Sequence, residues 1–121
     1  MRIQEYLAKT LVIENVTGYS FQRVRPRIVC KDGVSLSVQA GSFLYSTPRI
    51  DKVSEYSEVE VGYPSVTPPE SWFEYAEGGR YWAIADYKDT IYPYIPIDLV
   101  QQFVDDHGGI DFEKSIEGGE R

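Results

Sequence analysis

Apolar and polar residues alternate between Arg23 and Ala40 in a way that predicts a two-stranded β-hairpin. Side chains of an extended segment point to opposite faces in turn. The first strand therefore places three arginines on one face and apolar residues on the other, namely Val24, Pro26, Ile28 and Cys30. Lys31-Asp32-Gly33 is a turn sequence of the Asp-Gly kind. The returning strand alternates Val34, Leu36, Val38 and Ala40 with Ser35, Ser37 and Gln39.

The remaining pattern predicts further strands and at least two helices. Helical spacing of apolar residues predicts a first helix over 3–10, a short one over 70–77, and a clear one from Pro96 to His107, closed by two glycines. A strand is expected over 57–63, after a polar loop at 50–57. Others are expected over 81–85 and 90–95, where Pro93 indicates an edge position or a bulge. Asn15 to Ser20 is expected to be a turn-rich connection.

Together these elements predict an α+β fold. We expect an antiparallel β-sheet of about five strands with two or three helices packed on one side, in a single domain over residues 1–121. Residues 111–121 are acidic and contain glycine, which predicts a flexible tail. The apolar runs are too short to cross a bilayer and no signal-peptide pattern opens the chain, so we expect a cytoplasmic protein with no membrane partner.

Charge is distributed unevenly along the chain. Residues 1–49 hold seven basic and three acidic residues, a net charge of +4, whereas residues 50–121 hold five basic and sixteen acidic residues, a net charge of −11. The total of −7 argues against direct DNA binding, which needs a basic surface. It leaves room for one basic pocket. The acidic half is most simply interpreted as a solvated surface.

Nothing in the sequence indicates a catalytic or metal site. The chain has one cysteine, Cys30, and one histidine, His107. The first lies in an apolar alternation and the second at a helix end, where a cation is stabilising. No phosphate-binding glycine motif is present. We therefore expect a protein that is not an enzyme and that needs no cofactor.

The strongest candidate for ligand binding is the basic, polar and aromatic surface around the hairpin. Arginine binds phosphate through its planar fork, and Phe43 or Tyr45 would stack on a base. Hydroxyl and amide side chains would reach sugar or phosphate oxygens. The candidate residues are Arg25, Arg27, Gln39, Phe43, Tyr45 and Arg49. The alternative is a solvated strand face on which arginines pair with Glu58 and Glu60 of a neighbouring strand.

Three segments carry a family resemblance: RPRIVCKDGVSLSVQAGSFLYSTPR (25–49), EVEVGYPS (58–65) and YPYIPIDLVQQFVDDHGG (92–109). This set of a KDG hairpin, a Ser-Val-Gln strand, a Tyr-x-x-Pro-Arg loop and a His-Gly-Gly end resembles small phage-encoded accessory proteins of the anti-Thoeris sponge type. Members often have Cys where this chain has Ser46. The resemblance implies a homo-oligomer in the infected bacterial host that sequesters a cyclic ADP-ribose-type or cyclic oligonucleotide immune signal without cleaving it.

Other functions stay open on the residues alone. The acidic second half would suit a protein–protein inhibitor that imitates nucleic-acid phosphate and occupies a basic channel of a defence nuclease. A nuclease or phosphodiesterase, or a virion component without a small ligand, is a further alternative. Ten tyrosines suit half-buried strand positions, and some of them a subunit interface.

Overall fold

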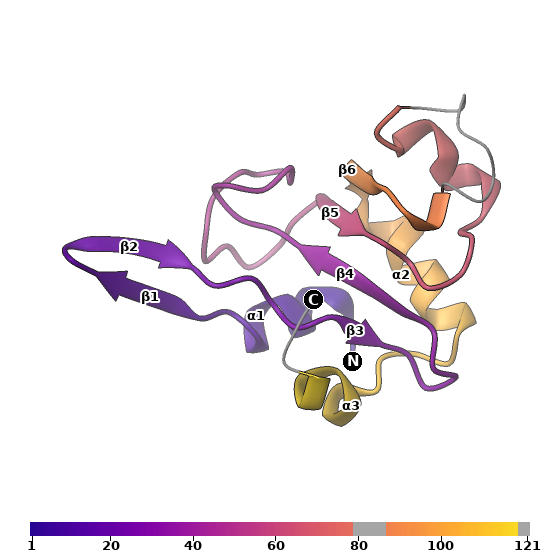
Figure 1. The fold of residues 1–121 in the computed structure, drawn as a ribbon, viewed down its shortest axis with the longest axis horizontal. Coiled ribbons are helices and arrows are strands. Elements are labelled where there is room, and N and C mark those ends of the chain that lie inside the picture. Colours follow the sequence, from indigo (N-terminus) through magenta and orange to yellow (C-terminus); the bar gives the residue numbers. More distant parts are fainter. Residues whose placement is uncertain (79–86, 119–121) are drawn as a thin grey trace.

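The described part of this computed structural model, residues 1–78 and 87–118, forms two antiparallel sheets with three α-helices and one 3-10 helix (Figure 1). The fold is α+β, as predicted, and its described part has six strands where about five were expected. The elements are α1 Ile3–Lys9, β1 Ile13–Val16, β2 Tyr19–Gln22, β3 Ile28–Val29, β4 Ser35–Gln39, β5 Glu58–Gly62, η1 Glu70–Tyr75, β6 Ile91–Pro96, α2 Ile97–Asp106 and α3 Phe112–Gly118. The predicted strand at 81–85 lies outside the described residues.

The larger sheet has the strand order β3-β4-β5-β6, and every neighbouring pair is antiparallel. Val38 of β4 lies opposite Val61 of β5, so the apolar positions of adjacent strands fall on the same face. β6 is an edge strand and its pairing with β5 is irregular between Val59 and Val61. Both features agree with the prediction made from Pro93, because proline cannot donate a hydrogen bond to a sheet.

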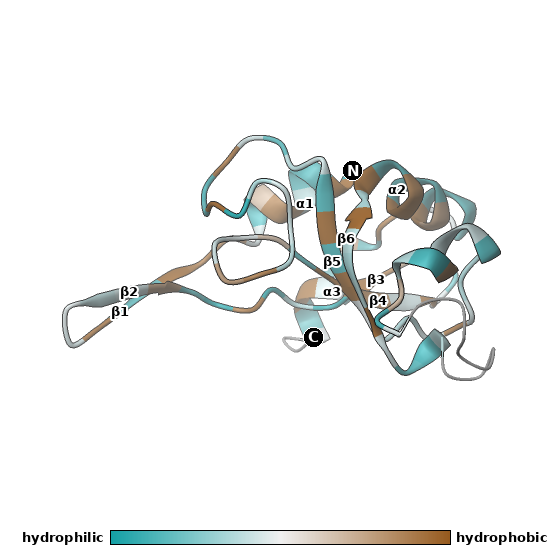
Figure 2. Ribbon diagram, turned by 90° about the horizontal axis from the view of Figure 1, so that it is seen from above, coloured by the Kyte–Doolittle hydropathy of each residue, from teal (hydrophilic) through white to brown (hydrophobic). Residues whose placement is uncertain are grey.

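α1 and α2 lie side by side on one face of this sheet, behind it in Figure 1 and above it in Figure 2. The backbone N–H of Ile3 at the start of α1 donates to Oε1 of Gln101 in α2, at 2.8 Å. The buried side chains of both helices join the sheet in one hydrophobic core. At its centre the Trp72 indole packs against the rings of Tyr92 and Phe103, with centroids 5.4 and 5.0 Å apart.

The first hairpin of the structure is β1–β2, which the sequence pattern did not predict. The turn expected within residues 15–20 is present, but the residues on either side of it belong to paired strands. Thr17 and Gly18 have φ angles of 49° and 85°, the geometry of a two-residue turn that matches the twist of the flanking strands. The hairpin extends away from the rest of the molecule (Figure 1).

The predicted hairpin over 23–40 is present in shortened form. The turn at 31–33 is confirmed, with Gly33 at φ +95°. The first strand, however, contains only Ile28 and Val29, and residues 23–27 lie outside any strand. The prediction that these residues alternate between two strand faces is therefore wrong, because β2 ends at Gln22 and β3 begins only at Ile28. Arg25 is buried and Val24 is exposed.

The end of the chain also differs from the flexible tail expected at 111–121. Residues 112–118 form α3, which lies against the β3 edge of the sheet. The hydroxyl of Ser115 accepts a hydrogen bond from the Val29 N–H at 2.8 Å, and Asp111 N–H donates to Val29 O at 2.8 Å. These bonds use backbone groups of an edge strand that would otherwise need water.

Candidate functional site

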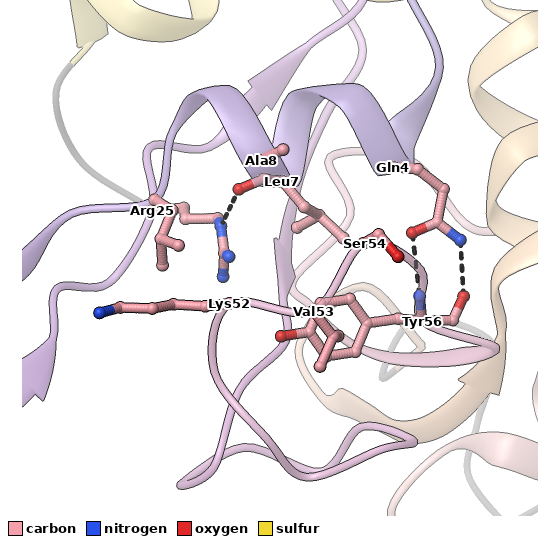
Figure 3. A pocket seen from close by; sticks show the side chains of 9 residues that line it. Gln4, Leu7, Ala8, Arg25, Lys52, Val53, Ser54 and Tyr56 are labelled. Atoms are coloured by element: carbon pink, nitrogen blue, oxygen red, sulfur yellow. Dashed lines mark hydrogen bonds between the residues drawn. The ribbon is translucent and has the colours of Figure 1, made fainter.

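A pocket of about 380 Å³ lies between α1 and the loop that precedes β5 (Figure 3). Its volume is within the range of small-molecule sites. Its walls combine an aliphatic floor from α1 with a few polar groups. The lining residues are Gln4, Leu7, Ala8, Leu11, Arg25, Lys52, Val53, Ser54 and Tyr56.

The side chain of Arg25 forms the inner wall of this pocket. Only 2% of the residue is exposed to solvent. Nε donates to the Leu7 carbonyl at 3.0 Å and Nη1 donates to the Ala40 carbonyl at 2.8 Å. The guanidinium is therefore tied at one side to the end of α1 and at the other to the end of β4. The Tyr56 hydroxyl and the Arg25 guanidinium lie toward the same part of the pocket, beside Lys52 (Figure 3).

The backbone of Arg25 is fixed as firmly as its side chain. Its N–H donates to Oε1 of Gln39 at 2.9 Å, and its carbonyl accepts from Nε2 of the same amide at 3.0 Å. Gln39 is itself buried on β4. Two predicted site residues, Arg25 and Gln39, are thus in direct contact, but Gln39 orients the arginine and does not line the pocket.

The charge of Arg25 has no ion-pair partner among the residues that the structure describes: no carboxylate there lies within 4.0 Å of its nitrogens. Burial lowers the pKa of the guanidinium, while Tyr56, Asp51 and Tyr6 raise it. An arginine side chain stays protonated in proteins. A buried cation is costly unless it is paired. The pocket therefore has on its wall a positive charge that no described carboxylate contacts directly.

The loop that closes the pocket is held in place by Gln4 of α1. Its Nε2 donates to the Tyr56 carbonyl at 2.7 Å, and its Oε1 accepts from the Tyr56 N–H at 3.0 Å. The Tyr56 hydroxyl donates to the Ile50 carbonyl at 2.6 Å. Lys52 is exposed at the rim and adds a second cation.

Arg27 is separated from this pocket and its fork is used within the protein. Nε donates to the Ser35 hydroxyl at 2.9 Å, and Nη2 donates to the Ser35 and Tyr63 carbonyls. Burial lowers its pKa. Arg27 therefore does not share a ligand surface with Arg25, contrary to the expectation of one arginine face. The alternative, pairing with Glu58 or Glu60, is not seen for Arg25 or Arg27 either.

The predicted aromatic residues form a separate surface. The Arg49 guanidinium lies 5.4 Å from the ring centre of Tyr45, and that ring lies 5.7 Å from Tyr94 of β6. Phe43 is 82% exposed and lines a smaller hollow with Gln22 and Asp51. The structure thus places the six predicted residues in four locations. Arg25 lies with Gln39, Tyr45 lies with Arg49, Arg27 is separate from both pairs, and Phe43 lines the smaller hollow.

Sequence analysis missed Gln4, Lys52 and Tyr56. The first is on a helix face and the other two lie in a loop about fifty residues further on, so no local pattern links them. The exposed pair of Asp32 and His107, whose Oδ2 and Nδ1 are 2.6 Å apart, and the buried Cys30 lie in other parts of the molecule. Among the described residues no group of three or more His, Cys, Asp or Glu side chains is arranged for a metal ion.

The comparisons with known proteins give no family for this chain. No family model, curated protein or solved structure matches it. Within residues 1–78 and 87–118, none of the helices has the length and apolar character needed to span a membrane.

Proposed function

We propose that the protein binds and sequesters a small anionic nucleotide without cleaving it, and that the Arg25 pocket holds the phosphate. The observation that supports this most directly is the buried guanidinium without a carboxylate in contact. A phosphate would supply a countercharge in direct contact with the guanidinium. Charge-assisted hydrogen bonds from a fixed arginine are among the strongest that proteins make.

The composition of the pocket favours binding over turnover. Its lining has no carboxylate, imidazole or thiol, which are the usual general acids, bases and nucleophiles. Ser54 supplies a hydroxyl, but no hydrogen bond in the described part of the chain joins it to Lys52 or Tyr56, the two lining side chains that could act as a base. Leu7, Ala8, Leu11 and Val53 offer an apolar wall against which a base or sugar would pack.

The resemblance to anti-Thoeris sponges supplies the biological setting. In that setting the ligand is a cyclic ADP-ribose-type molecule or a cyclic oligonucleotide made by a bacterial immune enzyme, and its capture protects an infecting phage. The pocket supports an anionic ligand with an apolar part, whereas the nucleotide, cyclic and immune character rests on the resemblance.

Native mass spectrometry tests this proposal. Purified protein is mixed with cyclic ADP-ribose isomers and with cyclic di- and trinucleotides, and bound nucleotide is then released by heat and analysed by chromatography. We expect a mass shift with at least one compound and recovery of that compound intact. Absence of a shift with every compound, or recovery of a cleaved product, would contradict the proposal.

A further inference from the structure

The β1–β2 hairpin, here called the arm (Ile13–Gln22), extends from the molecule without a layer packed on it (Figures 1 and 2). β1 and β2 pair only with each other in a sheet of their own, from Ile13↔Gln22 to Val16↔Tyr19. A two-stranded hairpin in water is marginally stable at best, because it has no further strand or helix against which to bury its side chains. The arm therefore needs a partner surface.

The register of the arm brings three of its apolar side chains to one face. Residues directly opposite each other in an antiparallel pair share a face, as do residues two apart along a strand. Val16, Tyr19 and Phe21 therefore project from the same side, together with Glu14, which pairs with Arg23 nearer the base of the arm. Asn15 and Ser20 lie on the other side and bond to each other. All three apolar side chains are exposed, and Tyr19 at the tip is 77% exposed. The tip of the arm thus presents an exposed apolar patch beside an ion pair, the kind of surface that packs on another protein.

An apolar groove of about 390 Å³ lies at the base of the same arm. Val12 and Val24 flank the arm directly, while Phe112 and Ile116 come from the α3 segment. Since Arg23 N–H donates to Val12 O at 2.8 Å, the ladder of the arm continues into the groove. Val12 therefore lies on the same face as Val16, and the groove begins where this face of the arm ends. Lys9 and Arg23 form part of its lining.

We propose that a second copy of this chain covers the arm, with the two arms packed side by side in opposite directions about a two-fold axis. In that arrangement Tyr19 at the tip of each arm occupies the groove at the base of the other. Residues 12 to 16 span about 14 Å at 3.4 Å per residue, and the distance from tip to base is the same in both copies. The surface is thus self-complementary, as a two-fold interface requires.

The area available suits a dimer of moderate stability. The exposed apolar side chains of the arm and groove, Val12, Val16, Tyr19, Phe21, Val24 and Ile116, are between 39% and 77% exposed. They offer roughly 600 Å² per copy, which in total is about the lower limit for a specific protein–protein interface. A partner other than a second copy would have to cover both the arm and the groove. In the two-fold arrangement, the arm of each copy covers the groove of the other, so both surfaces are covered in each chain.

Sedimentation velocity over a wide concentration range tests the proposal. The wild-type chain is expected to sediment as a dimer, and Tyr19→Lys is expected to raise the dissociation constant by about tenfold or more, because it places a charge in an apolar groove. Ile50→Lys is the matched control, since Ile50 is a large exposed side chain in another loop, and it should remain dimeric. A monomeric wild type, or a Tyr19→Lys variant that dimerises like the wild type, would overturn the proposal.

Disulfide trapping between two single variants tests the geometry. Tyr19→Cys mixed with Ile116→Cys under mild oxidation should give a cross-linked heterodimer, because the tip of one copy meets the groove of the other. The native Cys30 is fully buried and does not compete. Tyr19→Cys mixed with Ile50→Cys should give little product. Equal yields from both mixtures, or no cross-link in either, would contradict the arrangement.

Discussion

The side-chain amide of Gln39 makes hydrogen bonds to both backbone polar groups of Arg25, at 2.9 and 3.0 Å. Arg25 lies outside any strand, between β2 and β3, so the amide replaces the strand neighbour that its backbone lacks. Both residues are buried. The position of the cation in the pocket is thus determined by a side chain that is itself outside the pocket.

Gln39→Leu should lower the free energy of unfolding by about 2–4 kcal/mol, because two buried backbone groups of Arg25 lose their partners. It should also weaken nucleotide binding, since Arg25 is no longer held. Urea unfolding measures the first effect. The control is Ser37→Ala, which removes one hydroxyl bonded to the same amide at 3.1 Å and should cost about 1 kcal/mol. Equal losses in the two variants would contradict this role of Gln39.

The turn between β3 and β4 should make stability depend on pH through Asp32. Its carboxylate accepts from the Val34 N–H at 2.9 Å and lies 2.6 Å from His107 Nδ1. These contacts, the Val34 N–H first, lower the pKa of Asp32 below its usual 3.8. A carboxyl group whose pKa is lower in the folded than in the unfolded state stabilises the protein at pH values above the unfolded-state pKa. This stabilisation is lost as the pH falls through the folded-state pKa.

Asp32→Asn should therefore be less stable than the wild type near neutrality, and the difference should shrink at strongly acid pH. Urea unfolding at both conditions measures it. Glu55→Gln, an exposed residue of the 50–57 loop, serves as the control and should show little change of this kind. A difference between Asp32→Asn and wild type that stays constant from neutral to acid pH would disprove the linkage.

The parts of the fold that the sequence predicted correctly are those with an uninterrupted local period. α2 shows helical spacing of Val100, Phe103 and Val104 together with its glycine cap, and β5 shows strict alternation around Val59 and Val61. Residues 23–30 also alternate, but the chain changes strand partner inside that segment. Alternation cannot reveal such a break, so the prediction placed Arg25 on one strand face with Arg23 and Arg27.

The candidate site was predicted only in part, for a related reason. Arg25 was named, but its neighbours come from α1 and from the loop at 50–56, and their approach depends on tertiary packing. Tyr56 and Gln4 are brought together by two side-chain-to-backbone hydrogen bonds across fifty-two residues of sequence. No periodic pattern predicts such contacts. The arm was missed because residues 15–20 were interpreted as a turn-rich connection and not as two paired strand ends around a turn.

Cys30 should be unreactive in the folded protein. The thiol is fully buried in the core, and burial raises its pKa to about 11, so little thiolate is present near neutral pH. A coloured disulfide reagent should react with the native chain far more slowly than with the chain unfolded in guanidinium, in which one thiol per chain should titrate. Rapid reaction of the native protein would contradict the packing of β3 against the core.

Isothermal titration with the cyclic nucleotides tests the central claim most directly, by comparing the wild type, Arg25→Lys and Arg27→Lys. Both substitutions keep the charge and remove the planar fork, and only Arg25 lines the pocket. Thermal unfolding of each variant confirms that it is folded. We predict binding by the wild type, a loss of affinity of about tenfold or more for Arg25→Lys, and a change within about threefold for Arg27→Lys. Absence of binding by the wild type, or equal affinities of the two variants, would contradict the assignment of the nucleotide to the Arg25 pocket.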